Sequence, residues 1–131
     1  MKNKIIVVAA AIIKDHKLFV ARRAAQLKQG DLWELPGGKV ESGEDDAIAL
    51  KREIREELSL EIGVHEFIAE SEVELSERII RMRVYRCSVV DVTCLQCSDH
   101  SEIRWIQKSD LFKLAWAPAD IPILSVLAER L

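Results

Sequence analysis

The segment GGKVESGE at residues 37–44 and the segment DDAIALKREIREELSL that follows at residues 45–60 decide how we expect the chain to fold. The first predicts a glycine-rich turn, and the second predicts a helix that ends near Leu58. Apolar residues at helical spacing indicate the face that packs on a core. That apolar stripe consists of Ala47, Leu50, Ile54 and Leu58. Ser59 then occupies the C-terminal cap, where a left-handed conformation costs about 1–2 kcal/mol for a residue other than glycine.

Three glutamates make this helix a candidate metal site. Glu53, Glu56 and Glu57 stand at positions i, i+3 and i+4, so their carboxylates project from one face beside the apolar stripe. Like charges at this spacing destabilise a helix by roughly 0.2–0.5 kcal/mol per pair, and a bound cation would relieve that repulsion. Oxygen ligands at this density suit a hard divalent ion, Mg²⁺ or Mn²⁺ in its place. The alternative is a solvated helix whose acids pair with neighbouring cations. Those cations are Lys51, Arg52 and Arg55.

Composition and charge restrict the classes of partner. Apolar residues make up 49% of the 131 residues and charged residues 31%, which is typical of soluble globular proteins and predicts one domain over residues 1–131. The net charge of −3 provides no basic field to attract a nucleic-acid polymer. A small phosphorylated substrate is compatible with this charge, since a bound cation would invert it locally. Both a monomer and a homodimer are compatible with the composition.

The apolar run at residues 5–13 has two readings. Lys2 and Lys4 precede it, and together they resemble a signal peptide. The run is rich in β-branched residues, however, and leads directly into a turn and a second strand-like segment, so we predict a buried strand. It is too short to span a bilayer. We expect a cytoplasmic protein with no membrane partner.

The cysteines do not predict a disulfide framework. Cys94 and Cys97 form a C-x-x-C pair, but no second pair exists, and His100 alone would leave a structural zinc short of its usual four ligands. Unreactive thiols in or beside a strand are the favoured interpretation.

The order of the remaining elements predicts an α/β (α+β) fold, a mixed sheet with helices packed on it. Continuous or alternating apolar patterns predict strands; these are residues 5–13, 18–21, 32–35, 63–75, 78–90 and 103–106. The first two are expected to form a hairpin and the fourth and fifth an antiparallel pair. Ser109 can cap a short helix, and residues 120–131 are apolar at helical spacing.

The spacing of the central stretch resembles the Nudix box. Gly38 is followed after five residues by Glu44 and after seven more by REIREE at residues 52–57, with Ser59 where the family usually has glycine. Beyond the box, Arg22-Arg23, residues 33–39 and the tail APADIP at residues 117–122 resemble MutT-like nucleoside triphosphate pyrophosphohydrolases, in particular the bacterial branch that acts on CTP. The resemblance implies an α/β/α sandwich that converts a nucleoside triphosphate and water into the monophosphate and pyrophosphate.

The resemblance also implies roles for the acids of the box. Glu53, Glu56 and Glu57 would hold the divalent ions with a backbone carbonyl near Gly37 or Gly38. Arg52 would orient a glutamate, and Glu44 would support the site. Two candidates for the general base stay open, Glu53 and Asp99, and Glu102 is the nearby substitute for Asp99, which is one methylene shorter than the glutamate that relatives often carry there.

The substrate is expected to meet residues on both sides of the box. Arg23 can pair with a phosphate or stack on a base, or it can simply be a surface charge. Lys39 is a natural point charge for a phosphate, and Glu34 belongs to the matching stretch at residues 33–39. Asp120 aligns with the position that reads the base edge. If ionised, its carboxylate favours an exocyclic amine such as cytosine N4; if protonated, it also suits a lactam edge such as that of 8-oxoguanine. Asp120 can alternatively cap the final helix.

Two other functions compete with this prediction. ADP-sugar and dinucleoside polyphosphate hydrolases of the family often carry a proline or a tyrosine beyond the box, and residues 75–78 contain neither. Some Nudix domains sense nucleotides without hydrolysing them, typically with a broken box, whereas every acidic position of the box is intact here. Both observations favour a nucleoside triphosphate pyrophosphohydrolase.

Overall fold

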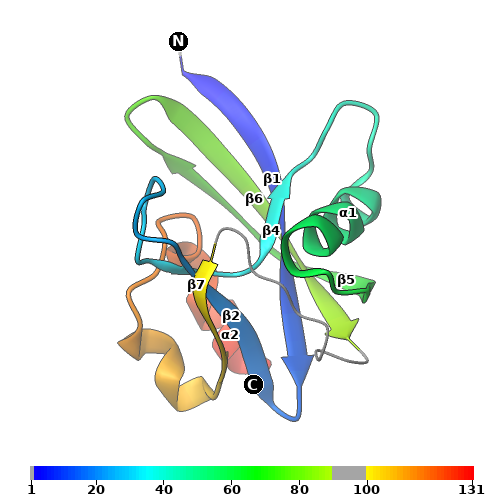
Figure 1. Ribbon diagram of the computed structural model, residues 1–131, viewed down its shortest axis with the longest axis vertical. Coiled ribbons are helices and arrows are strands. Elements are labelled where there is room, and N and C mark those ends of the chain that lie inside the picture. Colours follow the sequence, from blue (N-terminus) through cyan, green and yellow to red (C-terminus); the bar gives the residue numbers. More distant parts are fainter. Residues whose placement is uncertain (1, 90–99) are drawn as a thin grey trace.

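The computed structural model describes residues 2–89 and 100–131. Its strands are β1 (Asn3–Lys14), β2 (Lys17–Arg23), β3 (Trp33–Glu34), β4 (Gly37–Lys39), β5 (Ile62–Glu74), β6 (Arg78–Val89) and β7 (His100–Ile106). Its helices are α1 (Asp46–Leu58) and α2 (Leu124–Glu129), preceded by the 3₁₀ turns η1 (Lys108–Lys113) and η2 (Ile121–Ile123). Figure 1 shows their arrangement. The interpretations placed on Cys94, Cys97 and Asp99 lie outside the described residues.

The sheet is mixed, as predicted, and β1 connects its two parts. The strand order is β3-β2-β1-β6-β5, with β4 also paired to β1 and β7 to β2. β1 runs parallel to β6 and antiparallel to β4, whereas its antiparallel pairing with β2 covers the residues beside the turn. The predicted hairpin and the predicted antiparallel β5–β6 pair are both confirmed.

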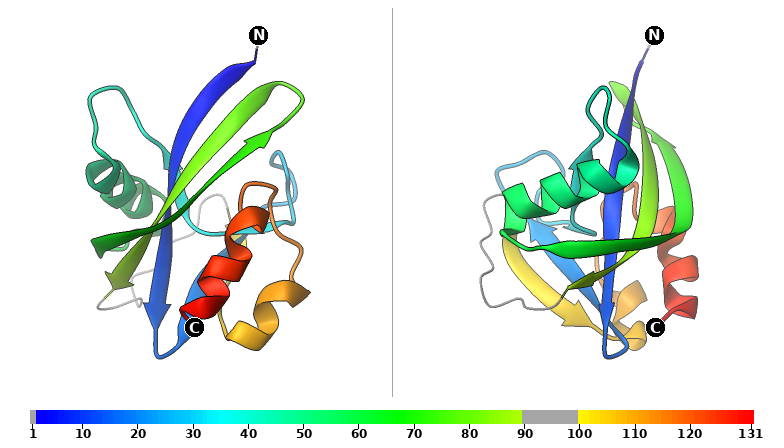
Figure 2. Two further views of the ribbon diagram at one scale, coloured as in Figure 1. Left: turned by 180° about the vertical axis from the view of Figure 1, so that it is seen from behind. Right: turned by 90° about the vertical axis from the view of Figure 1, so that its right-hand side faces the viewer.

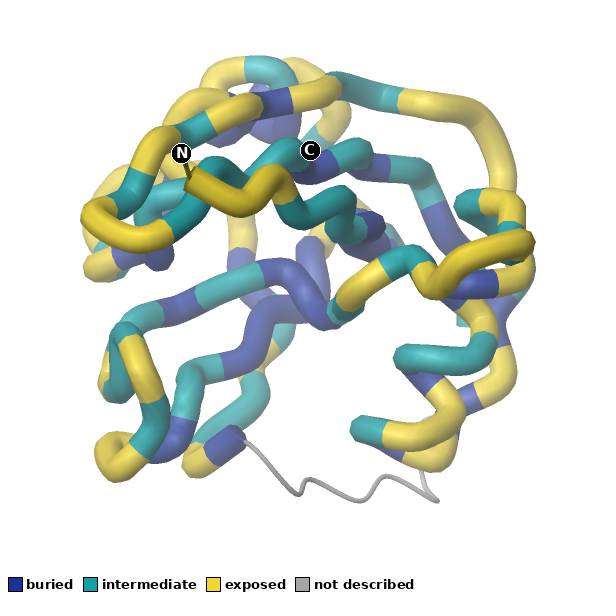
Figure 3. Tube along the Cα trace, turned by 90° about the horizontal axis from the view of Figure 1, so that it is seen from above, coloured by how far each residue is buried: buried dark blue, intermediate teal, exposed yellow. Residues whose placement is uncertain are grey.

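β1 is buried on both faces, which explains its continuous apolar sequence. Ala9 and Ala11 belong to the core cluster that also contains the buried side chains of α2. Val8, Ala10 and Ile12 point the other way and belong to the cluster beneath α1. Figure 2 shows α1 and α2 on opposite sides of β1, so helices cover both sides of the strand that joins the two parts of the sheet. Viewed from above, buried residues concentrate in the central strands, and exposed residues lie at the turns and outer edges (Figure 3).

Four local expectations need correction. The segment Gly37–Lys39 forms the strand β4, paired with β1, instead of belonging to a turn. Ala49 rather than Ala47 completes the buried face of α1, because Ala47 is half-buried at the rim of the helix contact. The short helix begins at Lys108 with Gln107 at its cap, and Asp110 accepts from the Gln107 N–H at 3.2 Å, so Ser109 is not the cap. The tail forms η2 before α2 instead of one continuous helix from residue 120.

None of the helices formed by residues 2–89 and 100–131 is long and apolar enough to cross a membrane.

Candidate active site

Helix α1 is fixed at its N-terminus by side chains from the preceding turn and from β6. Asp45 is the N-cap, and its carboxylate accepts from the Ile48 N–H at 2.8 Å, as capping residues do. Asp46 accepts from Arg83 Nη2 at 2.8 Å and from the Tyr85 hydroxyl at 2.5 Å. The helix is therefore held against the sheet at the end where the glycine-rich turn arrives.

Arg52 organises the acids around the first turns of α1. Its Nε and Nη2 donate to the two carboxylate oxygens of Glu44 at 2.7 and 2.9 Å, a bidentate geometry. The same guanidinium reaches Glu53 Oε1 at 3.0 Å, Glu56 Oε2 at 3.3 Å and the Lys39 carbonyl at 3.1 Å. The hydrogen bonds from Arg52 lower the pKa of Glu44 to about 2, so this carboxylate is ionised at neutral pH. Arg52 thus orients two of the three box glutamates, and Glu44 orients Arg52.

Two adjacent glycines let β4 approach both the sheet and the helix. A Cβ on Gly37 would lie 2.0 Å from the Val8 carbonyl oxygen, and a Cβ on Gly38 would lie 2.3 Å from Glu53 Oε2. The Glu53 carboxylate therefore rests against backbone at Gly38. Burial raises the pKa of Glu53 from its ordinary value despite the hydrogen bond from Arg52.

The donor set at this edge of α1 fits a divalent ion. Glu53, Glu56 and Glu57 supply carboxylate oxygens, and the backbone at Gly38 lies close to the Glu53 side chain. Hard cations prefer such oxygen ligands. Within the described residues, no three acidic, histidine or cysteine side chains already converge as a metal cluster. Because Arg52 holds oxygens of Glu53 and Glu56, these side chains would turn to meet an ion.

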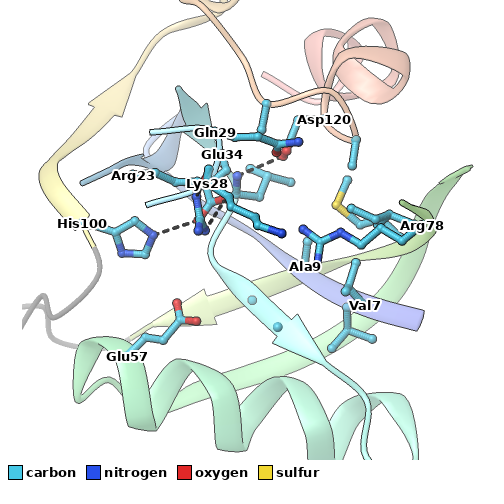
Figure 4. A pocket seen from close by; sticks show the side chains of 18 residues that line it. Val7, Ala9, Arg23, Lys28, Gln29, Glu34, Glu57, Arg78, His100 and Asp120 are labelled. Carbon is cyan, nitrogen blue, oxygen red and sulfur yellow. Dashed lines mark hydrogen bonds and ion pairs between the residues drawn. The ribbon is translucent and has the colours of Figure 1, made fainter. Parts of the chain in front are cut away.

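A cavity of about 180 Å³ lies between α1, β1 and the C-terminal segment. Its titratable lining residues are Arg23, Lys28, Glu34, Glu57, Arg78, His100 and Asp120. Val7, Ile80 and Met82 supply apolar surface. Glu57 rises from α1 on one side, while Glu34 and Asp120 lie on the other (Figure 4). One cavity therefore joins the box helix to a second group of carboxyls.

Asp120 is a buried acid bound to backbone from a distant part of the chain. Asp120 is 3% exposed, and its Oδ2 accepts from the Leu35 N–H at 3.0 Å. Burial, reinforced by the negative charge of Glu34, raises the pKa of Asp120 to about 8, so the acid is mainly protonated at neutral pH. Although Asp120 precedes η2, its side chain makes no capping hydrogen bond. The segment is held in place by Ala117, whose N–H donates to the Trp33 carbonyl at 2.8 Å.

The Glu34 carboxylate is held from two sides. Arg23 Nη1 lies 3.4 Å from both oxygens of Glu34, and Arg23 Nε donates to the Lys28 carbonyl at 2.9 Å. His100 Nε2 lies 2.9 Å from Glu34 Oε2. These contacts hold the Glu34 carboxylate in the same cavity as Asp120.

The structure separates the predicted site residues into two neighbouring groups. The cavity brings together Arg23, Glu34, Gly37, Gly38, Glu57 and Asp120. The network around Arg52 contains Glu44, Glu53 and Glu56.

The remaining predicted residues lie outside these two groups. Lys39 is exposed, and only its backbone carbonyl contacts the network, by accepting from Arg52. Glu102 does not line the cavity; its Oε2 accepts from Arg104 at 2.6 Å. Asp99 lies outside the described residues.

Sequence reasoning missed four polar residues of the cavity: Lys28, Gln29, Arg78 and His100. Lys28 lies in a polar loop and Arg78 opens β6 after a turn, positions where a basic residue is usually just solvated. The sequence around His100 suggests only an incomplete zinc site with Cys94 and Cys97. No local pattern distinguishes these residues, because long-range pairing brings them together.

Comparison with known proteins places this geometry in a family. The model of the NUDIX domain matches residues 3–127. The chain is 42% identical over 118 residues to the CTP pyrophosphohydrolase of Escherichia coli, covering 90% of this chain and 87% of that protein. It is 34% identical over 87 residues to the 8-oxo-dGTP diphosphatase of Haemophilus influenzae, covering 65% of this chain and 64% of that protein. The solution structure of the E. coli ORF135 protein superposes with a TM-score of 0.82 at 40% identity, covering 98% of this chain and 91% of that one.

Proposed function

Because this chain belongs to the NUDIX domain family, whose members act on pyrophosphate bonds with a divalent metal, we propose that it converts a nucleoside triphosphate and water into the monophosphate and pyrophosphate. The proposed substrate is CTP, dCTP or a modified cytosine nucleotide, in line with its 42% identity to a CTP pyrophosphohydrolase. The proposed ion is Mg²⁺, with Mn²⁺ able to substitute.

The observation that carries this proposal is the cavity with two chemically different ends. Glu57 of the box helix lies at one end, and the carboxyls of Glu34 and Asp120 lie at the other. The Glu34 carboxylate accepts a hydrogen bond, and a protonated Asp120 donates one. This acceptor–donor pair complements the N4 amine and N3 acceptor of cytosine. The opposite end suits the polyphosphate.

Basic side chains away from Glu34 support the placement of the polyphosphate. Arg78 lines the cavity, and Lys39 is exposed directly after Gly38 on β4. Their charges would offset those of the phosphates, which the chain as a whole, at −3, does not attract. Positioning the phosphate chain in this way is a large part of catalysis in phosphoryl transfer.

The proposed chemistry assigns the box residues separate tasks. Glu53, Glu56 and Glu57, with backbone at Gly37 or Gly38, would hold the divalent ions, which neutralise phosphate charge and lower the pKa of bound water. Arg52 keeps Glu53 and Glu56 oriented, and Glu44 fixes Arg52. A carboxylate within hydrogen-bond reach accepts the proton from the attacking water. Glu53 and Asp99 are the two candidates for this base.

A second candidate substrate is 8-oxo-dGTP. The specific observation in its favour is the buried Asp120, whose raised pKa makes it a donor as well as an acceptor toward a lactam edge. The 34% sequence identity to the 8-oxo-dGTP diphosphatase of Haemophilus influenzae supports the same alternative.

A hydrolysis panel with Mg²⁺ tests the proposal. CTP, dCTP, UTP, dATP, 8-oxo-dGTP, ADP-ribose and a diadenosine polyphosphate are compared, and pyrophosphate, phosphate and nucleotide products are measured separately. We expect pyrophosphate release led by cytosine nucleotides. If 8-oxo-dGTP were hydrolysed fastest, the proposed substrate would change but the proposed reaction would stand. If only ADP-ribose were hydrolysed, the proposal of a nucleoside triphosphate substrate would be rejected.

Glu57→Gln is the matched test of the metal site. We expect the variant to fold and to lose kcat by about 100-fold or more, since it removes an anionic ligand. Glu129→Gln, an equivalent change at an exposed residue of α2, serves as the control and should behave as the wild type. Equal kcat values for Glu57→Gln and wild type would overturn the assignment of Glu57.

A further inference from the structure

We propose that His100 is a positioning residue that fixes the Glu34 carboxylate, so that the cavity discriminates cytosine from uracil. The inference rests on the proposed function, because it concerns the base end of the same cavity. His100 contributes to the cavity wall, yet its side chain is only 1% exposed. It can therefore act through Glu34 rather than by extensive contact with a ligand.

An irregularity in the sheet aims His100 at Glu34. β7 pairs with β2 so that Ile103 opposes Ala21 and Glu102 opposes Arg22, but the register then shifts and His100 opposes Arg23. In a regular ladder Ser101 would face Arg23, and His100 would point to the opposite side. The bulge brings the His100 side chain to the face that carries Arg23. Bulges commonly re-aim side chains next to active sites.

Glu34 reaches the same face from the other side of β2. In β3 it opposes Ala21, two residues before Arg23, so Glu34 and Arg23 share one face. His100 and Glu34 therefore come from strands on either side of β2 and meet across it. Figure 4 shows the His100 ring directed at Glu34 and Arg23.

The two contacts on Glu34 have different effects. Arg23 Nη1 lies at 3.4 Å from both oxygens, a long and symmetrical contact that supplies charge without selecting an oxygen. His100 Nε2 lies at 2.9 Å from Oε2. Because a carboxylate can only accept, the Nε2–H donates to Oε2. This hydrogen bond fixes the rotation of the carboxylate and leaves Oε1 as the acceptor for the base.

A fixed acceptor discriminates between the two pyrimidines. Cytosine presents an amine at C4, which donates to Oε1, whereas uracil presents a carbonyl oxygen, which a carboxylate repels. Loss of the His100 hydrogen bond would let the Glu34 carboxylate rotate toward Arg23. The affinity for the cytosine nucleotide would then fall, whereas the affinity for the uracil nucleotide would not, because uracil does not donate to this acceptor.

Calorimetric titration of the protein with CMP and with UMP tests this inference without requiring turnover. His100→Gln places an amide near the position of Nε2 and can still donate to Glu34, whereas the shorter His100→Asn cannot reach it. Ser101→Ala, an exposed neighbour on β7, is the control. Thermal unfolding confirms that each variant is folded before titration.

We expect the wild type, His100→Gln and Ser101→Ala to prefer CMP over UMP. In His100→Asn the ratio of CMP to UMP affinity should fall by about tenfold, mainly through weaker CMP binding. An equal loss for both nucleotides, a parallel loss in His100→Gln, or no preference in the wild type would each overturn the inference. The hydrolysis panel tests the proposed function independently, so the two failures are distinguishable.

Discussion

At the scale of single residues, the two glycines of β4 have different neighbours and therefore different roles. The sequence predicts that backbone at Gly37 and Gly38 approaches other groups closely, but it does not say which groups. In the structure Gly37 faces the backbone of β1, which can shift only at a cost, and Gly38 faces the flexible Glu53 side chain. Gly37 is thus required by the sheet and Gly38 by the arrangement of the site.

Alanine substitutions should separate these roles. Gly37→Ala places its Cβ against the Val8 carbonyl and should lower the free energy of unfolding by about 1–3 kcal/mol. Gly38→Ala should displace the Glu53 carboxylate and lower kcat by about tenfold or more, with a smaller loss of stability. Urea unfolding and steady-state kinetics measure the two effects. A Gly38→Ala enzyme with wild-type kcat would show that the position of Glu53 does not matter for the reaction.

The residues that sequence reasoning found and missed differ in one physical respect. Glu53, Glu56 and Glu57 are ordered by helical spacing, which is local and can be read directly. His100 faces Glu34 because of a bulge between two strands that are distant in sequence. The protonation of Asp120 likewise depends on burial by other segments, so the sequence leaves both of its ionisation states open.

At the scale of elements, both ends of α1 follow the rules of helix capping. Asp45 caps the N-terminus as its residue type predicts. Ser59 takes the left-handed conformation at the C-terminus with φ 55° and ψ 32°, and its N–H donates to the Arg55 carbonyl at 3.0 Å. The geometry predicted for the box is therefore present with serine in place of glycine. The strained conformation falls on a residue that carries a Cβ.

Ser59→Gly should stabilise the protein. Relief of the left-handed strain should raise the free energy of unfolding by up to about 1 kcal/mol, after the greater flexibility of glycine in the unfolded chain is subtracted. Ser59→Ala is the control, since it removes the hydroxyl and keeps the Cβ. Denaturant midpoints of the two variants give the difference. A glycine variant no more stable than the alanine variant would mean that the Cβ costs nothing at this cap.

Local apolar spacing predicts only part of the structure of residues 120–131. Apolar spacing correctly predicts helix in residues 124–129, but the preceding residues form η2. Asp120 directs its side chain to Leu35 instead of to the helix, a contact across 85 residues of sequence. Local periodicity cannot reveal a tertiary hydrogen bond of that kind.

At the scale of the whole molecule, the sequence predicts the fold class because the apolar run of β1 requires cover on both faces. The parallel pairing of β1 with β6 and the division of the sheet are long-range features that no local pattern specifies. These features bring β3 and the tail to the same cavity as α1. The site is thus assembled by topology, whereas its metal-binding half is encoded in one continuous stretch.

The dependence of global stability on pH should report the state of Asp120. Its pKa is raised from 3.8 to about 8 by burial, so between these values the folded chain binds more protons than the unfolded chain. Stability due to this group is fully present below about pH 4 and is lost as pH rises through 8. Glu44 and Glu66 have the opposite sign, since arginine partners lower each pKa to about 2; their contribution is present above pH 4.5 and lost as pH falls toward 2. The two effects together predict greatest stability in mildly acidic solution.

Asp120→Asn isolates the alkaline side of this profile. The amide oxygen can still accept from the Leu35 N–H, but the side chain no longer titrates. Urea unfolding between pH 5 and 8 should show the wild type losing stability relative to the variant by up to about 1.4 kcal/mol per pH unit. Contributions from other titrating groups cancel in the difference between the two proteins. Parallel profiles would mean that Asp120 is already ionised in the folded protein at neutral pH, and the cavity would then offer two acceptors to the base instead of an acceptor and a donor.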